Sequence, residues 1–542
     1  MPNSPCMSYV PAPLPDERPA RYADRLAQHY AYHASRAHRR AYGQYFTTPD
    51  IAEFMAGLCS VDTPTLSVLD PGAGTGTLAC ALCEYLACHT SVKAISLDAY
   101  ETDAALAAML ERALHHLSAY LLRRGCALSY EVVTDDFVLS AREALTPAEG
   151  LFPGGPPARL YDVAIGNPPY FKIPKSDPRA KAAAVVVHGQ PNIYALFMAA
   201  SAGVLRVKGQ LIFITPRSFA SGPYFRLFRE RFFFRMRPTA LHIFESRAEA
   251  FERDAVLQEN VILVARRDDG WLGRLGVEED GVIVSVCNGS SDLHRRKERR
   301  VPLSQVLSLG GTDRILTIAT DDETDAIRKL VQSWPGSLST YGLQVSTGPV
   351  VAFRARDLLS DSGDVRTHAP LLWMHNVHPM SVTWPRLGTR KPQYVRLGGR
   401  AATLLVPART YVLLRRFSSK EEERRLVAAP LAREQLGSAL VGLENHLNYI
   451  YRPHGELSVN EAWGLAVLYN SSVLDLYFRA MNGSTQVSAT ELRTMPLPSL
   501  DVIRQIGRLA RASKDPLREA GSLVLYAMPG VSHIAQGADS RV

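Results

Sequence analysis

The sequence predicts an α/β fold with a mostly parallel sheet, followed by a second domain of mixed α+β structure. The chain has 542 residues, more than one hydrophobic core usually supports, so we expect at least two domains. Between residues 65 and 216, short apolar runs alternate with helical stretches, which is the pattern of parallel strands joined by crossover helices. Beyond about residue 270 this alternation gives way to short strands, turns and a few helices.

The first residues, 1–20, are rich in proline and lack the basic-then-apolar order of a signal peptide. We expect a disordered tail there, and a flexible tail over residues 526–542. No apolar run is long enough to cross a bilayer, so we expect a cytoplasmic protein without a membrane partner. The change in pattern near residue 270 predicts one domain over residues 21–270 and a second over residues 271–525.

The first predicted strand, residues 65–70, ends at Asp70 and passes directly into a glycine-rich turn that opens a helix. Gly72, Gly74 and Gly76 stand where the backbone must turn tightly and approach a ligand at the positive end of that helix. The spacing is G-x-G-x-G behind an acid, whereas dinucleotide sites use G-x-G-x-x-G. Because an acid suits a cationic amino acid group better than a pyrophosphate, the turn favours S-adenosylmethionine as the cofactor.

The helix after this turn contains Cys80 and Cys83, two of the seven cysteines of the chain. A C-x-x-C pair indicates a metal site when a second cysteine pair or a histidine pair accompanies it, and the sequence offers neither. Small, half-buried thiols on an apolar helix face explain the pair better. We therefore predict no metal.

The second and third predicted strands end in residues that suit the rest of this cofactor. The second ends at Glu101, where an acid can accept hydrogen bonds from both ribose hydroxyls. The third follows the helical stretch AALAAMLERALHHLSAYLLRR and ends in DDF, where Asp136 can accept from the adenine amino group while Phe137 covers the ring. Each residue alone can be an exposed loop acid or a core phenylalanine. Three successive strand ends of this kind favour a cofactor site.

The fourth predicted strand stops at Asn-Pro-Pro-Tyr, within YDVAIGNPPYFKI. Pro168 and Pro169 hold the chain extended and remove backbone donors, so the carbonyl of Pro168 and the side-chain oxygen of Asn167 face a pocket. Two acceptors can take both protons of a planar amino group and expose the nitrogen lone pair for attack on a methyl group. Tyr170 then offers a ring for stacking. The alternative is a proline-rich turn with asparagine as a cap.

The chain has a formal net charge of +8 and a pI of about 9.1. Many of its basic residues are concentrated in a few runs. These runs are RLFRERFFFRMR, RRKERR and RRFSSKEEERR, the last of which partly neutralises itself. An excess of positive charge favours a polyanionic partner such as nucleic acid, although such runs also occur as solvated faces.

Taken in order, these elements resemble the gamma-class adenine-N6 DNA methyltransferases. The resemblance rests on the segments YGQYFTTPDIAEFM, LDPGAGTGTLA, YETD, DDF and GNPPYF. It implies a Rossmann-like methyltransferase fold with a seven-stranded sheet, S-adenosylmethionine as cofactor, and Asn167 among the cofactor contacts as well as at the target base. It also implies that the Y-F-T-P element wraps over the methionine end of the cofactor through Tyr45, Phe46, Thr47 and Pro49. A helix start, with Thr48 as cap and Pro49 in the first turn, explains the same residues.

The later segments look like the modification methylases of the PstI and BsuBI restriction systems, often labelled Eco57I-like. The similar part runs roughly from residue 41 to residue 498. In related enzymes a second aromatic residue sandwiches the flipped base, and Phe251 is the best-placed candidate, although a core phenylalanine would look the same.

This resemblance implies a catalytic domain over residues 21–270 and a DNA target-recognition domain over residues 271–525. Lysine and arginine side chains in the second domain would contact phosphates, while a smaller polar set would read base edges. Asn445, His446 and Asn448 are candidates for such reading or are simply loop caps. Ser484, Thr485 and Gln486 are possible phosphate contacts, beside a turn and a helix cap that explain the same segment.

The expected function is therefore transfer of a methyl group to the N6 amino group of an adenine flipped out of double-stranded DNA, as the modification half of a restriction-modification system. A partner endonuclease would be a separate chain, because no nuclease motif is evident. Three alternatives remain: a protein-glutamine methyltransferase, an RNA adenine methyltransferase and an inactive DNA-binding module. The last is disfavoured because the acid, the glycines and N-P-P-Y are all present.

Overall fold

The computed structural model divides the chain into two compact units, residues 1–320 and 321–542. The residues that the structure describes are 10–145, 159–187, 191–244, 260–310, 313–317, 322–364, 366–386, 388–418, 422–481 and 486–526.

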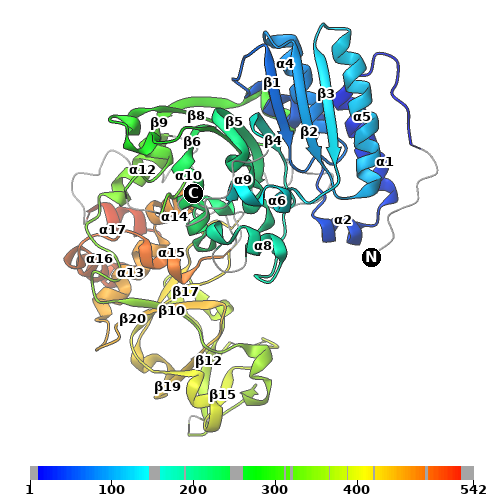
Figure 1. Ribbon diagram of the computed structural model, residues 1–542. Helices are drawn as coiled ribbons and strands as arrows, with labels where there is room; N and C mark the ends of the chain where they lie inside the picture. The colour runs from blue at the N-terminus through cyan, green and yellow to red at the C-terminus, as the bar shows by residue number, and fades with distance from the viewer. Residues whose placement is uncertain are drawn as a thin grey trace, which may run out of the picture. The chain divides into compact units, whose positions relative to one another are not determined.

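The first unit is built on a nine-stranded sheet with the strand order β3-β2-β1-β4-β5-β7-β6-β8-β9 (Figure 1). The strands β1 to β5 are parallel, β7 is antiparallel to β5 and β6, and β8 and β9 extend the sheet beyond β6. The strands are β1 (Thr65–Asp70), β2 (Ala94–Tyr100), β3 (Ala127–Val133), β4 (Tyr161–Gly166), β5 (Leu205–Pro216), β6 (Met236–Phe244), β7 (Asn260–Arg267), β8 (Gly281–Cys287) and β9 (Lys297–Pro302).

Helices cover both faces of this sheet. One face packs against α1, α3, α4 and α5, and the other packs against α6, α7, α9 and α10. The helices of the unit are α1 (Pro19–His33), α2 (Arg36–Tyr42), α3 (Pro49–Gly57), α4 (Thr77–His89), α5 (Ala104–Leu122), α6 (Phe137–Ser140), α7 (Arg142–Leu145), α8 (Pro178–Ala182), α9 (Ile193–Val204), α10 (Arg226–Arg235) and α11 (Leu303–Val306). Because both faces are covered, the end of β5 is a continuous buried run from residue 209 to residue 216.

Local chemistry explains where the helices near the carboxyl edge of the sheet begin. The side chain of Asp103 caps α5 by accepting hydrogen bonds from the backbone nitrogens of Ala105 and Leu106. Helix α4 starts after Gly76, whose φ of 91° lies in the left-handed region that favours glycine. In α4, the buried carboxylate of Glu84 accepts from the backbone nitrogen of Ala20 at 2.7 Å and from Arg18 Nε at 2.8 Å. This pair of hydrogen bonds fixes α1 against α4.

The α/β class and the mostly parallel sheet are confirmed, and the first and fourth predicted strands end at Asp70 and Gly166. The sheet has nine strands where the resemblance implied seven. The extra strands, β8 and β9, were assigned to the second domain because no long crossover helix separates them from β7. For the same reason, the boundary predicted between residues 270 and 271 falls inside the first unit, which extends to Thr320.

The second unit is a mixture of small sheets and helices, in agreement with the predicted α+β structure. Its sheets have the strand orders β10-β20-β17-β18, β11-β15-β12-β19-β16 and β13-β14. The strands are β10 (Gln344–Thr347), β11 (Leu359–Ser360), β12 (His368–Leu372), β13 (Val377–His378), β14 (Ser381–Val382), β15 (Tyr394–Arg396), β16 (Leu405–Pro407), β17 (Tyr411–Arg415), β18 (Ala428–Leu431), β19 (Leu440–Leu443) and β20 (Leu447–Tyr451). The helices are α12 (Asp322–Gln332), α13 (Val459–Asn470), α14 (Ser472–Met481), α15 (Ala489–Thr494), α16 (Leu500–Ala512) and α17 (Ala520–Tyr526).

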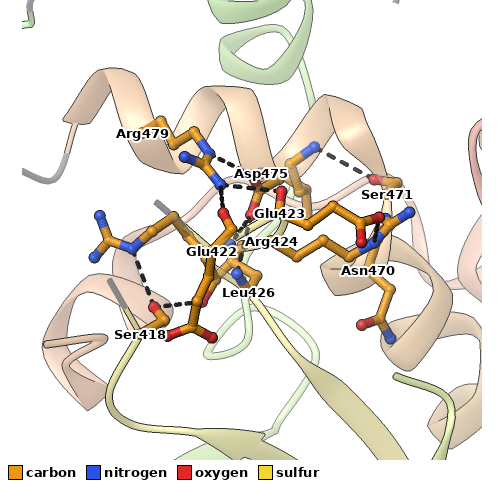
Figure 2. Close-up of polar contacts among 11 residues, drawn as sticks. Ser418, Glu422, Glu423, Arg424, Leu426, Asn470, Ser471, Asp475 and Arg479 are labelled. Carbon is orange, nitrogen blue, oxygen red and sulfur yellow. Dashed lines mark hydrogen bonds and ion pairs between the residues drawn. The ribbon is translucent and has the colours of Figure 1, made fainter. Parts of the chain in front are cut away.

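A buried polar cluster attaches the segment before β18 to α14 (Figure 2). Asp475 Oδ1 accepts from the backbone nitrogens of Arg425 and Leu426 at 2.7 and 2.9 Å, and Asp475 Oδ2 accepts from Arg479 Nε at 2.6 Å. Arg479 also donates to the carbonyls of Glu422 and Glu423. Arg425, in the basic run RRFSSKEEERR, is itself fully buried, and its Nε donates to Ser418 Oγ at 3.0 Å, so part of this run is used to hold the fold together.

The basic run on α10 contains another arginine that is used internally. Arg229 is fully buried, donates to Asp313 through Nε and Nη2, and donates to the carbonyls of Phe219 and Gly222. A buried guanidinium needs such partners because an unpaired charge in the interior is very costly. This arginine is therefore structural, and it is not part of a solvated face.

Candidate active site

A cavity lies at the carboxyl ends of β1, β2 and β4, between the glycine-rich turn and the segment that precedes α3. Its lining combines glycines, aromatic rings and acids from seven parts of the first unit. The lining residues are Tyr42, Gly43, Gln44, Tyr45, Phe46, Thr47, Pro71, Gly72, Ala73, Gly74, Thr75, Thr77, Leu78, Tyr100, Glu101, Thr102, Leu106, Asp135, Asp136, Phe137, Asn167, Pro169, Phe171, Arg179 and Phe197. In parallel α/β sheets, ligands bind at this edge of the sheet.

The glycine-rich turn forms one wall of the cavity. Gly74 has a φ of 57°, in the left-handed region, and a side chain at Gly76 would clash with Leu110 of α5 at 2.8 Å. Asp70 lies behind the turn: its Oδ1 accepts weakly from the backbone nitrogen of Gly72 at 3.4 Å, and its Oδ2 has no partner among the described residues. Burial raises the pKa of Asp70 to about 7. An unsatisfied carboxyl behind a glycine turn fits a ligand that carries a cationic amino group.

Glu101, directly after β2, is half-buried, and the loss of solvent around its carboxyl raises its pKa to about 7. Its Oε2 accepts from the backbone nitrogen of Gly74 at 3.0 Å and its Oε1 from that of Asp103 at 2.8 Å. Each carboxylate oxygen has a second lone pair, so both can still accept from a pair of hydroxyls on a ligand. This geometry fits a ribose.

Asp103 connects this wall to the helices that precede the Y-F-T-P element. Its Oδ2 accepts from Tyr30 Oη at 2.9 Å and contacts His38 Nε2 at 3.2 Å and Gln44 Nε2 at 3.4 Å. Helices α1 and α2 are therefore fixed next to Glu101, the acid that lines the cavity and that accepts from the Asp103 backbone nitrogen. The segment leading to Tyr45 follows directly after α2.

Asp136 and Phe137 lie at the start of α6. Asp136 caps this helix by accepting from the backbone nitrogen of Leu139 at 3.2 Å, and Arg179 Nη1 lies 3.6 Å from its Oδ2. The ring of Phe137 packs edge-on against Tyr100, with centroids 5.1 Å apart, and near Phe197. The aromatic lining fits a planar base, and the second oxygen of Asp136 is the acceptor beside it.

Asn167, the first residue after β4, has its side-chain amide held at both ends. Its Nδ2 donates to the carbonyl of Tyr45 at 3.0 Å and to Thr47 Oγ1 at 3.0 Å. Because a backbone carbonyl can only accept, the nitrogen end of the amide must point toward Tyr45. Oδ1 therefore points away from that segment, and the Tyr170 hydroxyl donates to it.

Tyr170 is buried, and its hydroxyl also lies 3.1 Å from the carbonyl of Ile214 in β5. Its ring stacks against that of Tyr45, with centroids 5.8 Å apart and planes at 25°. Pro49 occupies the first turn of α3, and Thr48 is the cap residue without a side-chain capping bond. The Y-F-T-P element is thus a helix start that also contacts Asn167.

The structure brings most of the predicted site residues to this cavity. Lining it are Tyr45, Phe46, Thr47, Gly72, Gly74, Glu101, Asp136, Phe137, Asn167 and Pro169. Adjacent in the chain, but not among the lining residues, are Pro49, Asp70, Gly76, Pro168 and Tyr170. Phe251 lies outside the described residues. Sequence reasoning missed Arg179 and Phe197, because neither belongs to a motif and both reach the cavity only through the fold.

In the second unit, the candidate base-reading residues have partners within that unit. Asn448 is fully buried in β20, where its Nδ2 donates to the carbonyl of Val487 and its Oδ1 accepts from Thr347. His446 Nδ1 lies 2.6 Å from Glu444 Oε1. Ser484 and Thr485 lie outside the described residues.

No group of three or more histidine, cysteine or acidic side chains is placed to hold a metal ion in the part of the chain that the structure describes. Within the same part, none of the helices combines the length and apolar character needed to cross a membrane.

Comparison with known proteins gives consistent matches. A family model described as Eco57I restriction-modification methylase matches residues 144–251. The type II methyltransferase M.BsuBI of Bacillus subtilis is 33% identical over 470 residues, which cover 86% of this chain and 89% of that protein. M.PstI of Providencia stuartii is 32% identical over 469 residues, with the same coverage of both chains. Among solved structures, a cryo-EM structure of a DrdV–DNA complex has a TM-score of 0.47 at 13% identity, covering 91% of this chain and 59% of that chain.

Proposed function

We propose that this chain is a site-specific DNA methyltransferase. The proposal starts from its family, because the chain belongs to the type II restriction-modification methyltransferases that include M.BsuBI and M.PstI. The proposed reaction transfers a methyl group from S-adenosylmethionine to the N6 amino group of an adenine flipped out of double-stranded DNA. The observation that carries this proposal is the fixed amide of Asn167 at the cavity, with its oxygen directed away from the segment that holds its nitrogen.

The proposed site for S-adenosylmethionine uses the groups that line or support the cavity. Asp70 and the glycine-rich turn would hold the amino acid part, Glu101 the ribose, and Asp136 with Phe137 the adenine ring. The unsatisfied Asp70 oxygen, the two remaining Glu101 lone pairs and the aromatic wall fit these parts of the cofactor. When bound, the cofactor supplies an electrophilic methyl group.

The proposed role of the chain is to change the geometry of the amino nitrogen. Asn167 Oδ1 and the carbonyl of Pro168 accept the two amino protons, which draws the nitrogen from planar toward tetrahedral and exposes its lone pair. A carbonyl oxygen has two lone pairs, so Oδ1 can accept from the Tyr170 hydroxyl and from the amino group together. No strongly basic group is required, because orientation and fixed dipoles lower the barrier.

Double-stranded DNA is the proposed partner, and a separate restriction endonuclease is the proposed functional partner. Flipping an adenine out of the duplex costs a few kcal/mol, which contacts elsewhere on the DNA must offset. The second unit, with its short strands and exposed arginines, is the proposed recognition domain. An RNA adenine or a protein glutamine offers a similar planar amino group and is the alternative substrate class.

The experiment that tests this proposal is expression of the chain in a methylation-free bacterial host, followed by single-molecule sequencing of plasmid DNA with detection of modified bases. N6-methyladenine at one position of one short motif is the expected result. If a folded protein that binds S-adenosylmethionine leaves the plasmid unmodified, adenine in duplex DNA is not its substrate when it acts alone.

A further inference from the structure

Thr47 makes one of the two hydrogen bonds that hold the amide nitrogen of Asn167. It lies between Phe46 and the start of α3, lines the cavity, and is 5% exposed. Its Oγ1 accepts from Asn167 Nδ2 at 3.0 Å, and the carbonyl of Tyr45 accepts from the same nitrogen, also at 3.0 Å. The two protons of the Asn167 amide nitrogen are thereby matched with two acceptors.

The orientation of this amide matters because its two ends have opposite hydrogen-bonding character. The oxygen accepts, whereas the NH₂ group only donates. If the amide turned over, an NH₂ group would face the amino group of the target base, and no hydrogen bond could form between them. The reaction proposed above therefore needs the nitrogen end to be held on the side away from the target base.

The fold sets the position of both acceptors. Gln44 contacts Asp103, which fixes the chain just before Tyr45, and Pro49 begins α3 just after Thr48. The segment between these two points is short, so the Tyr45 carbonyl and the Thr47 hydroxyl are presented together. The Tyr45 carbonyl is main chain and cannot be removed by substitution, which leaves Thr47 as the side chain that can be tested.

We propose that Thr47 is a positioning residue for methyl transfer, acting through Asn167. This inference rests on the proposed function, because it assigns the Asn167 oxygen to the amino group of the target base. The hydroxyl of Thr47 accepts from Asn167 and keeps its own proton for another partner. A residue acting this way changes the rate of the methyl-transfer step and leaves cofactor affinity nearly unchanged.

The test compares Thr47→Val with Thr47→Ser in the full-length protein. Valine keeps the shape of threonine but cannot accept a hydrogen bond, whereas serine keeps the hydroxyl. Single-turnover methylation of DNA at saturating S-adenosylmethionine gives the rate of the transfer step, and calorimetry gives the cofactor Kd. Thermal unfolding of both variants checks that the fold is retained.

The expected result is a rate roughly tenfold lower for Thr47→Val, the size expected for losing one neutral hydrogen bond that orients a reacting group. The cofactor Kd should stay within about threefold, and Thr47→Ser should restore most of the rate. A wild-type rate in Thr47→Val overturns the inference. So does a loss that appears only as weaker cofactor binding, because Thr47 would then be a cofactor contact.

A crystal structure of Thr47→Val provides a readout that needs no substrate. Asn167 should lose a partner at Nδ2, and its side chain should shift or become mobile. An Asn167 side chain unchanged in position overturns the inference whatever the substrate proves to be. A wild-type protein that does not methylate adenine in DNA would instead count against the proposed function, so the two failures are distinguishable.

Discussion

At the scale of single residues, the side chain on which the proposed reaction depends most is that of Asn167. Removing it in Asn167→Ala eliminates one of the two acceptors for the amino protons, so methyl transfer should fall by at least two orders of magnitude. S-adenosylmethionine affinity, measured by calorimetry, should change by only a few-fold, because the glycine turn and Glu101 remain. The control is Asn288→Ala, an exposed asparagine in the loop after β8, which should keep full activity. Near-normal turnover in Asn167→Ala would show that the amide oxygen is not needed.

Two other residues make the cavity sensitive to pH. Burial raises the pKa of Asp70 and of Glu101 to about 7, from ordinary values of 3.8 and 4.5. Both acids hold a proton more tightly in the folded protein than in the unfolded chain. Their contribution to stability is therefore fully present below about pH 4 and is lost as the pH rises to about 7.

Cofactor binding should have the opposite dependence on pH. Hydroxyl and ammonium donors on S-adenosylmethionine need ionised acceptors, so its affinity should be weaker at pH 6 than at pH 8, and binding near pH 7 should release protons. Calorimetry in buffers of different ionisation enthalpy measures that release. In Glu101→Gln, affinity should be lower at pH 8 and the pH dependence smaller. Binding that releases no protons at pH 7 would contradict this account.

Much of the site at this scale follows from the sequence, because short motifs fix the chemistry of a strand end. Asn167, Glu101, Gly72 and Gly74 were predicted from their positions after apolar runs, and they do line one cavity. The position of Asp70 at the strand end was predicted, but its full burial behind the turn, outside the cavity lining, was not, because that depends on which way the side chain points. The contact between Thr47 and Asn167 joins residues 120 positions apart, which no local pattern encodes.

At the scale of elements, helices α13 and α16 of the second unit approach each other closely at two glycines. A Cβ at Gly464 would lie 1.9 Å from the carbonyl oxygen of Ile503, and one at Gly507 would lie 1.9 Å from that of Asn460. Each glycine therefore allows the backbone of the facing helix to approach, and any side chain there would push the helices apart.

The predicted consequence is strong destabilisation by Gly464→Ala. Although alanine favours helices, the clash with main chain cannot be relieved by a rotamer change, so we expect a loss of about 2–4 kcal/mol in the free energy of unfolding. Denaturant titration measures it. The matched control is Gly273→Ala, where no atom lies within 4 Å of the added Cβ, which should change stability by less than about 0.5 kcal/mol. Equal effects of the two substitutions would contradict the packing argument.

Elements were predictable where strands and long helices alternate, as from β1 to β5. Beyond that point the described connections from β7 to β8 and from β8 to β9, residues 268–280 and 288–296, contain no long crossover helix, so the periodic signal that marks a parallel sheet disappears although the sheet continues. The many strands of two to five residues in the second unit are too short to show a period at all.

At the scale of the whole molecule, part of the positive charge in the basic runs is used inside the fold and does not face solvent. Arg229 and the arginines around Asp475 are used within the fold. In contrast, residues 352–400 contain seven arginines and one lysine against three aspartates, a net charge of +5 out of the +8 of the chain. This stretch spans most of the five-stranded sheet of the second unit, so we expect it to contribute most to the attraction of DNA phosphates.

DNA affinity should therefore fall steeply with salt, and specific arginines should account for the steepness. Arg354 and Arg356 are exposed and have no acidic partner among the described residues, whereas Arg366 is exposed but paired with Asp364 at 2.7 Å. Replacing Arg354 and Arg356 by glutamine should lower the slope of log affinity against log salt by about 2, since each phosphate contact contributes roughly 1.

Arg366→Gln should leave the slope nearly unchanged, because its charge is already offset by Asp364. Fluorescence anisotropy with a labelled duplex at several salt concentrations measures these slopes. If the double variant kept the wild-type slope, this sheet would not be the surface that meets the phosphates.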